Sequence, residues 1–248
     1  DELHKLWATL GEDYFLRERA DDIAWHTEAI ADHRHEEGAL VLVKQASESP
    51  ISNATQIFVH TQDEPNTFAR ICAALETLDL SIHDARIYSD TDGGTLDTFF
   101  VLKSDGSSLD THPDTFLEIE TSIRQSLSEA ALKNVSRHTP RTVKAFTIPT
   151  TITFLDDQAG GLTTLEIVTA DRPGLLARLG SVLSKHEVTI QGAKIQTLGE
   201  RVEDIFFLTD ATGGALQDRS LLQQLEQELN AELGAEPSGE ALQSGVTI

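Results

Sequence analysis

The hydrophobic positions of the chain fall into short stretches that alternate between the periodicities of strands and helices. After residue 55, strand-like apolar runs are separated by stretches in which apolar residues recur at steps of three and four. Asp92-Gly93-Gly94 stands between two of the runs and is typical of a hairpin turn. The pattern predicts strands at 56–61, 80–89, 96–103 and 142–155, one helix carrying Phe68, Ile71, Leu75 and Leu78, and another carrying Phe116, Ile119, Ile123 and Leu127.

The same order of elements returns about 108 residues later. Thr61–Ser89 aligns without a gap with Thr169–Thr197, and the two segments are identical at 9 of 29 positions. A fixed internal period indicates that one supersecondary unit occurs twice. The second copy is predicted to have strands at 164–169, 187–197 and 202–209, helices from Pro173 to about Lys185 and from about Gln217 to Leu233, and a last strand within 240–248.

The order β-α-β-β-α-β is that of the ferredoxin-like unit, so the fold class is predicted to be α+β with two such units. The first unit is expected at 56–155 and the second at 163–248. The continuous apolar runs Phe99–Leu102 and Ile205–Leu208 predict that both faces of each sheet are buried, with another such unit as the simplest cover.

A short helical segment precedes the repeats. Residues 1–36 carry two helical patterns separated at Gly11 and are expected to be the tail of a preceding domain, because two short helices cannot close a core of their own. Residues 37–55 are expected to form one strand and a linker. Since the chain lacks Met and opens within a helical pattern, it is expected to be a fragment of a longer protein.

Composition narrows the range of partners. The formal net charge of −22 argues against binding of nucleic acid, because phosphate neutralisation requires clustered Lys and Arg. No apolar run approaches the roughly 20 residues that a membrane span needs. Cys72 is the single cysteine, so disulfides cannot hold the fold and a cytoplasmic location is expected; Cys72 itself is expected to be a small buried residue.

The turn Asp171-x-Pro173-Gly174 is the candidate site. It joins a predicted strand to a predicted helix, where Asp171 can accept backbone N–H bonds and Pro173 tolerates a first-turn position. Gly174 allows close approach of a ligand. Open amides at a helix start suit a carboxylate, and Asp171 suits an ammonium, so the turn offers both complements of an amino acid. The alternative interpretation is a helix cap without a ligand.

Thr169–Leu176, with Leu183, Ile190 and the following strand–hairpin–strand, resembles an ACT domain. The resemblance implies a small βαββαβ module that binds an amino acid against the loop between its first strand and helix and the start of its second strand, where units pair. Carried over to repeat one, the implied ligand-binding residues are Asp63, Glu64, Asn66, Thr67, Phe68, Ser81, Ile82 and Asp84. In repeat two they are Asp171, Arg172, Gly174, Leu175, Leu176, Thr189, Ile190 and Gly192.

The chain departs from the ACT pattern at two places. Asn66 stands where the family usually has Gly, although Asn tolerates left-handed backbone better than most residues. Ser81 and Thr189 stand where many members have Asn. Repeat two is therefore expected to be the better binder.

A wider resemblance covers the chain from about Leu3 to Leu233. Gly11–Arg17, Ala24–Ile30 and Leu40–Lys44 resemble the C-terminal part of bacterial PII uridylyltransferase/uridylyl-removing enzymes, and Asp84–Ile87 and Gln191–Ile195 strengthen the match. The resemblance implies nucleotidyltransferase and HD phosphohydrolase domains, expected to use Mg²⁺ or another divalent metal, ahead of tandem ACT domains that sense glutamine.

Neither catalytic centre nor any cofactor site is visible in the chain itself. A nucleotidyltransferase needs a Gly-Ser turn followed by paired Asp, and an HD hydrolase needs a His-Asp pair among its metal ligands. His26, His33 and His35 are spaced like metal ligands without such a pair, so solvated histidines are the preferred interpretation.

The sequence thus predicts a glutamine-sensing regulatory region that acts on PII through the full-length enzyme and can pair as a homodimer through its ACT sheets. Two alternatives stay open: a stand-alone amino-acid-binding regulator, and a structural dimerisation module without a ligand.

Overall fold

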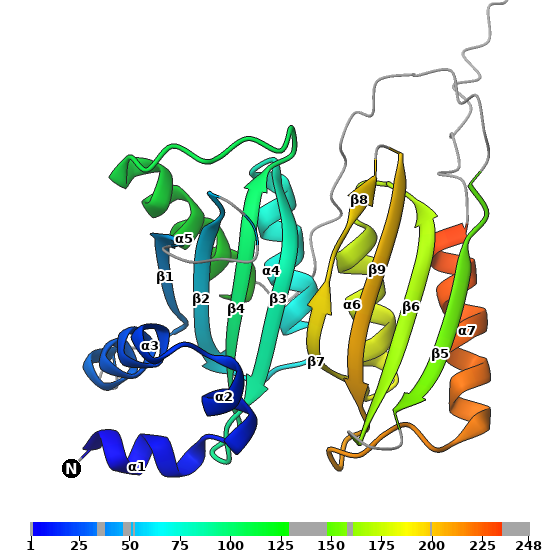
Figure 1. Ribbon diagram of the computed structural model, residues 1–248, viewed down its shortest axis with the longest axis horizontal. Helices are drawn as coiled ribbons and strands as arrows, with labels where there is room; N and C mark the ends of the chain where they lie inside the picture. The colour runs from blue at the N-terminus through cyan, green and yellow to red at the C-terminus, as the bar shows by residue number, and fades with distance from the viewer. Residues whose placement is uncertain are drawn as a thin grey trace, which may run out of the picture.

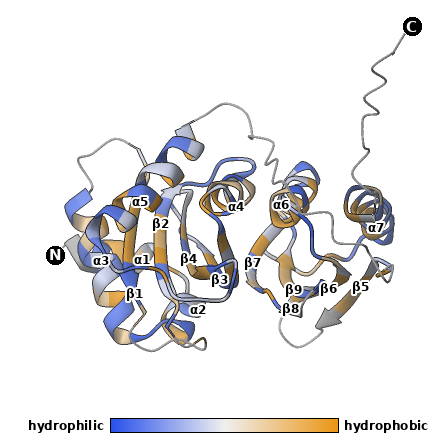
Figure 2. Ribbon diagram, turned by 90° about the horizontal axis from the view of Figure 1, so that it is seen from above, coloured by the Kyte–Doolittle hydropathy of each residue, from blue (hydrophilic) through white to orange (hydrophobic). Residues whose placement is uncertain are grey.

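The computed structural model describes residues 2–33, 38–46, 51, 53–128, 148–157, 161–198 and 200–234. Its strands form one antiparallel sheet in the order β1-β2-β4-β3-β7-β9-β6-β5, with the short β8 paired to β9 (Figure 1). Four helices, α5, α4, α6 and α7, lie side by side on one face of this sheet (Figure 2). The α+β class and the two ferredoxin-like units predicted from the sequence are confirmed.

Unit one contributes four strands and two helices to this layer. They are β1 (Leu40–Gln45), β2 (Thr55–Gln62), α4 (Thr67–Thr77), β3 (Leu80–Ser89), β4 (Gly94–Lys103) and α5 (Pro113–Ser128). In unit two the elements are β5 (Thr151–Asp157), β6 (Leu162–Ala170), α6 (Leu175–Lys185), β7 (Thr189–Lys194), β8 (Thr197–Leu198), β9 (Arg201–Thr209) and α7 (Arg219–Gly234). One core runs beneath all four helices and includes Leu75, Phe99, Leu179 and Phe206.

The edge strand of each unit differs from the sequence prediction. Of the residues 142–155, 151–155 lie in β5, which pairs along its whole length with β6 of unit two and does not close unit one. In unit one the corresponding edge position, beside β2, is taken by β1, which the sequence analysis had set apart as a strand before the repeat. Each unit therefore takes its fourth strand from the segment ahead of it. The last strand expected within 240–248 lies outside the described residues.

The two units meet along a seam made by β3 and β7. These strands pair antiparallel over three residues, with Ala85 opposite Ala193. Above them α4 packs on α6, and Gly180 allows the approach, since a Cβ there would lie 2.9 Å from Phe68 Cδ1 and 3.3 Å from the Ala69 backbone nitrogen. Pairing within one chain thus joins the two sheets into one.

The other face of unit one is covered by the N-terminal helices α1 (Glu2–Thr9), α2 (Glu12–Arg17) and α3 (Ala20–His33). Leu6, Tyr14 and Ile30 from these helices pack on Phe58 and Leu96 of the sheet. The prediction that both faces of Phe99–Leu102 are buried is confirmed. Phe100 and Leu102 are covered by Ala46, Ile51 and Ala54, between β1 and the start of β2, beside the part of the sheet that the helices cover. Within the chain, this cover is not another sheet unit, contrary to the expectation. The helices lean on the repeat that follows them.

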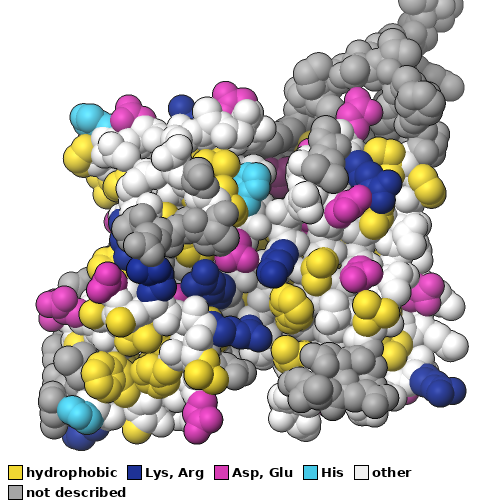
Figure 3. All heavy atoms as spheres, in the orientation of Figure 1, with side chains coloured by type: hydrophobic (Ala, Val, Ile, Leu, Met, Phe, Trp, Pro, Cys, Tyr) yellow, Lys and Arg dark blue, Asp and Glu magenta, His cyan; other side chains and the backbone are white. Residues whose placement is uncertain are grey.

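Unit two differs on the same face. Along β9 buried and half-buried residues alternate, with Phe206 and Leu208 buried and Ile205 and Phe207 half-buried. Within the single chain this run is therefore buried on one face only, and cover of the other face by a second copy stays a prediction. Figure 3 shows this face with hydrophobic side chains scattered among polar and charged ones. Within the described residues, no helix is long and apolar enough to cross a membrane.

Candidate functional site

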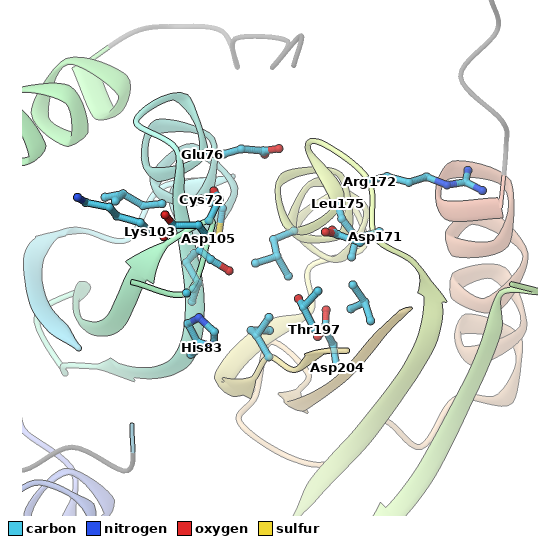
Figure 4. Close-up of a pocket in the computed structure, with 18 residues that line it drawn as sticks. Cys72, Glu76, His83, Lys103, Asp105, Asp171, Arg172, Leu175, Thr197 and Asp204 are labelled. Atoms are coloured by element: carbon cyan, nitrogen blue, oxygen red, sulfur yellow. The ribbon is translucent and has the colours of Figure 1, made fainter. Parts of the chain in front are cut away.

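A cavity of about 400 Å³ lies at the seam, between the loop that opens α6 in unit two and strand β3 in unit one (Figure 4). It is lined from unit one by Cys72, Glu76, Leu80, Ser81, Ile82, His83, Lys103, Ser104, Asp105 and Gly106, and from unit two by Asp171, Arg172, Leu175, Leu176, Ile195, Thr197, Val202 and Asp204. Neither unit forms the cavity alone.

The loop before α6 has the geometry that its sequence predicts. Gly174 is the N-cap of α6 and adopts left-handed backbone, with φ of 73°, which glycine reaches without steric cost. Its carbonyl accepts the first helical hydrogen bond from the Arg178 N–H at 2.9 Å. Its own N–H donates a 2.6 Å hydrogen bond to Glu76 Oε1 of unit one. The amide at this helix start therefore already holds a carboxylate, one that comes from across the seam.

Repeat one has a matching contact on the other side of the seam. Asn66 occupies the position equivalent to Gly174 and adopts left-handed backbone, with φ of 68°, so the tolerance expected of Asn at this position is realised. The Asn66 N–H donates a 2.9 Å hydrogen bond to Ser184 Oγ of α6. Because Ser184 is the repeat equivalent of Glu76, the two contacts are related by the internal repeat, with a hydroxyl in one and a carboxylate in the other.

A buried carboxylate lies on the last core strand of each repeat. Asp204 on β9 and Asp97 on β4 are each 1% exposed. Burial raises the pKa of Asp204 to about 7; the charge of Asp171 raises this pKa further, and the hydrogen bond from the Gln196 N–H opposes the shift. Burial likewise raises the pKa of Asp97 to about 7. Of the two, only Asp204 lines the seam cavity, where Figure 4 shows its carboxylate pointing toward that of Asp171.

The structure brings together the predicted loop of repeat two and the predicted strand of repeat one. The predicted residues that line the seam cavity are Asp171, Arg172, Leu175, Leu176, Ser81 and Ile82. Gly174 contacts the cavity residue Glu76 through its N–H. Arg172 borders the cavity, but in Figure 4 its side chain points away, toward α7. Ligand binding by these residues stays a prediction.

The other predicted residues lie elsewhere. Thr189, Ile190 and Gly192 are on β7 and Asp84 is on β3, where Asp84 forms an ion pair of 3.5 Å with Arg86; none of the four lines the seam cavity. Glu64 and Thr67 line a broader groove between the N-terminal helices and α5. Asp63, Asn66 and Phe68 line neither this groove nor the seam cavity.

Sequence reasoning missed the cavity residues outside the loop-and-strand pattern, above all Glu76, His83, Val202 and Asp204. A signal for Asp204 was present, because it is an acidic residue at the start of an apolar strand and recurs as Asp97 in repeat one. Cys72 is buried, as expected, and forms part of the cavity wall. Burial raises the pKa of its thiol.

The histidines of the N-terminal helices need one correction. His26 is fully buried, stacks on Phe58 with ring centroids 3.8 Å apart and shares a 3.0 Å hydrogen bond with the Tyr14 hydroxyl, so the expectation that it is solvated was wrong. His35 lies outside the described residues. The described part of the chain contains no group of three or more His, Cys, Asp or Glu that could hold a metal ion.

Comparison with known families agrees with the two units. Residues 163–230 match the model of the ACT domain, and residues 49–130 match that of the ACT-like domain of plant bHLH transcription factors. Residues 1–29 match the fifth domain of uridylyltransferase GlnD. The fold and these matches define a protein with tandem ACT domains behind a helical segment.

Curated relatives extend the match to the whole chain. A bifunctional uridylyltransferase/uridylyl-removing enzyme from Stutzerimonas stutzeri is 42% identical over all of the chain, and one from Azotobacter vinelandii is 45% identical over 91% of it. The chain spans 28% and 25% of the length of these two relatives. The chain corresponds to the C-terminal ACT-domain region of bifunctional uridylyltransferase/uridylyl-removing enzymes.

Proposed function

We propose that the seam cavity binds a free amino acid, glutamine, and that the chain is the glutamine-sensing region of a uridylyltransferase/uridylyl-removing enzyme. The observation that carries the proposal is that two acidic side chains, Asp171 and Asp204, line one cavity between two units. The cavity lies beside the start of α6, where Glu76 occupies the Gly174 N–H. Acidic side chains complement an ammonium, and a helix-start amide complements a carboxylate once a ligand displaces Glu76 from it. An α-amino acid carries both groups on one carbon.

The position of the cavity supports a regulatory role. Since unit one supplies β3 and α4 and unit two supplies the α6 loop and β9, a ligand here contacts both units at once. Such a ligand favours the relative orientation of the units in which it makes the more favourable contacts. A coupling free energy of about 1–3 kcal/mol is typical of such effects.

In the full-length protein, glutamine binding would be coupled to two enzymatic activities in the attached domains. Low glutamine would favour uridylylation of the PII signalling protein, and bound glutamine would favour removal of the uridylyl group. The relatives that match the whole chain are named for both activities, which supports this assignment.

The experiment is calorimetric titration of the chain with glutamine, with glutamate, serine and glycine as comparison ligands. Asp171→Ala is expected to weaken glutamine binding at least tenfold, since it removes an ammonium acceptor. Asp63→Ala is the matched control, because Asp63 occupies the equivalent loop position in repeat one and does not line the cavity. Absence of binding by all four amino acids would contradict the proposal and favour a structural seam.

A further inference from the structure

Asp204 has a free acceptor atom in a buried place. Its Oδ1 accepts a 3.2 Å hydrogen bond from the Gln196 N–H. Among the described residues, no donor reaches its Oδ2, although this oxygen is shielded from solvent. A buried polar atom without a hydrogen-bond partner destabilises the folded state, and more so when it carries charge. Such an atom beside a cavity is the expected state of a group whose partner is a ligand.

In repeat one the equivalent carboxylate, Asp97, has a hydrogen-bond donor within its own strand. The Thr95 hydroxyl, two residues before Asp97 on β4, donates a short hydrogen bond to Asp97 Oδ1. In repeat two the residue two before Asp204 is Val202, which has no hydroxyl and which lines the seam cavity. The exchange of Thr for Val between the repeats leaves the shape of the side chain almost unchanged and removes the internal donor.

We infer that Asp204 receives the α-ammonium group of the amino acid bound in the seam cavity, in the place that the Thr95 hydroxyl fills in repeat one. The inference rests on the proposed function and extends it from the loop to β9. It also explains why a chain with two repeats would have one such binding site. Asp97 already accepts a hydrogen bond within its own strand and lines neither of the two cavities described for the chain.

The surroundings of Asp204 make this recognition dependent on pH. The other titratable or charged groups lining the cavity are Cys72 and Glu76 from α4, His83 from β3, Lys103 and Asp105 from the end of β4 and the turn after it, and Asp171 and Arg172 from the α6 loop. Burial lowers the pKa of His83, which favours its neutral form. Lys103 and Asp105 are exposed, and Asp171 is the group whose charge acts on Asp204.

Ligand binding is therefore expected to be coupled to the release of a proton from Asp204. In the empty cavity burial favours protonated Asp204, whereas an ammonium ligand favours the carboxylate. Binding near or below pH 7 therefore releases a proton from Asp204, and affinity rises as the pH rises through about 7. Between pH 6 and pH 8 the ionised fraction of a group with this pKa grows about tenfold, so affinity is expected to grow by about that factor.

The test uses two substitutions on β9 and one on β4. Val202→Thr gives Asp204 the internal donor that Asp97 has, and Asp204→Asn removes the charge; each is expected to weaken glutamine binding at least tenfold. Thr95→Val, the reverse exchange in repeat one, is expected to leave affinity within about twofold. Circular dichroism and thermal unfolding identify any variant that fails to fold, and Val202→Thr is nearly isosteric.

Titrations at pH 6.5 in two buffers with different heats of ionisation count the protons released. Wild type is expected to release a proton on binding glutamine, and Asp204→Asn is expected to release none. If Val202→Thr and Asp204→Asn bind glutamine as wild type does while Asp171→Ala binds weakly, the inference is overturned and the proposed function stands. If wild type binds no amino acid, both are overturned.

Discussion

Gly174 and Asn66 each donate a backbone hydrogen bond to the opposite unit, and the two contacts are equivalent. Each lies at the start of a helix in left-handed backbone, and each donates its N–H to a side chain on the helix of the opposite unit, Gly174 to Glu76 and Asn66 to Ser184. The internal repeat relates the two donors and also the two acceptors. The acceptors differ in charge, so the two helix starts are equivalent in backbone and unequal in chemistry.

Glu76→Ala is expected to separate stability from binding. The substitution removes the carboxylate that occupies the Gly174 N–H, which a ligand carboxylate would otherwise have to displace. Thermal unfolding is expected to show a loss of about 1.5–3 kcal/mol, as for other hydrogen bonds to charged groups. Calorimetry is expected to show tighter glutamine binding in the same variant.

The control for this prediction is Ser184→Ala, which removes the equivalent acceptor in the other contact. It is expected to cost about 1 kcal/mol of stability and to leave glutamine affinity unchanged. Weaker glutamine binding by Glu76→Ala would show that Glu76 contributes to the site and does not compete with the ligand.

The close approach of α4 and α6 makes a second prediction. Gly180→Ala places a methyl group 2.9 Å from Phe68 Cδ1 and 3.3 Å from a backbone nitrogen of α4, so the two helices must move apart. Overpacking of this kind costs typically about 1–3 kcal/mol. Denaturant unfolding is expected to show that loss together with weaker amino-acid binding, since the seam cavity lies beside these helices. Gly11→Ala, where nothing lies within 4 Å of the new methyl group, should leave both unchanged.

The repeat explains why much of this fold could be predicted from the sequence. A period that aligns Thr61–Ser89 with Thr169–Thr197 fixes the loop, the helix and the following strand together, and the structure has all three in both units. The edge strands could not be assigned in the same way. Whether residues near 151–157 pair with the strand before or after them depends on contacts across the sheet, which local pattern does not carry.

The candidate site was predicted in part for the same reason. The loop residues Asp171 and Gly174 belong to a recognisable turn, whereas Glu76 and His83 reach the cavity only because β3 pairs with β7. Asp204 and Val202 could have been found by comparing the repeats position by position, since Thr95-x-Asp97 becomes Val202-x-Asp204. His26 was misassigned because an isolated histidine in a helix carries no signal for the Phe58 ring that covers it.

His26 provides a third prediction, on acid stability. Burial lowers the pKa of His26 to about 3, while the unfolded chain protonates near 6.5. Between these values the unfolded state binds a proton that the folded state does not, so stability is lost as the pH falls from about 6.5 toward 3. His26→Phe is expected to reduce the loss by up to about 1.4 kcal/mol per pH unit in urea unfolding. An unchanged slope would contradict burial of a neutral imidazole against Phe58.

The last prediction concerns Asp97, which makes stability fall as the pH rises. Its folded-state pKa of about 7 lies above the unfolded value of 3.8, so the folded chain holds a proton that the unfolded chain has lost. The stability that this proton represents is complete below about pH 4 and is lost as the pH rises through 7. Asp97→Asn cannot ionise and is expected to remove about 1.4 kcal/mol per pH unit of that loss between pH 4 and pH 7. Urea unfolding at pH 5, 6, 7 and 8 measures this pH dependence of stability. Asp92→Asn, at an exposed position, is the control. Parallel stability profiles for wild type and Asp97→Asn would show that Asp97 is ionised in the folded chain throughout this range.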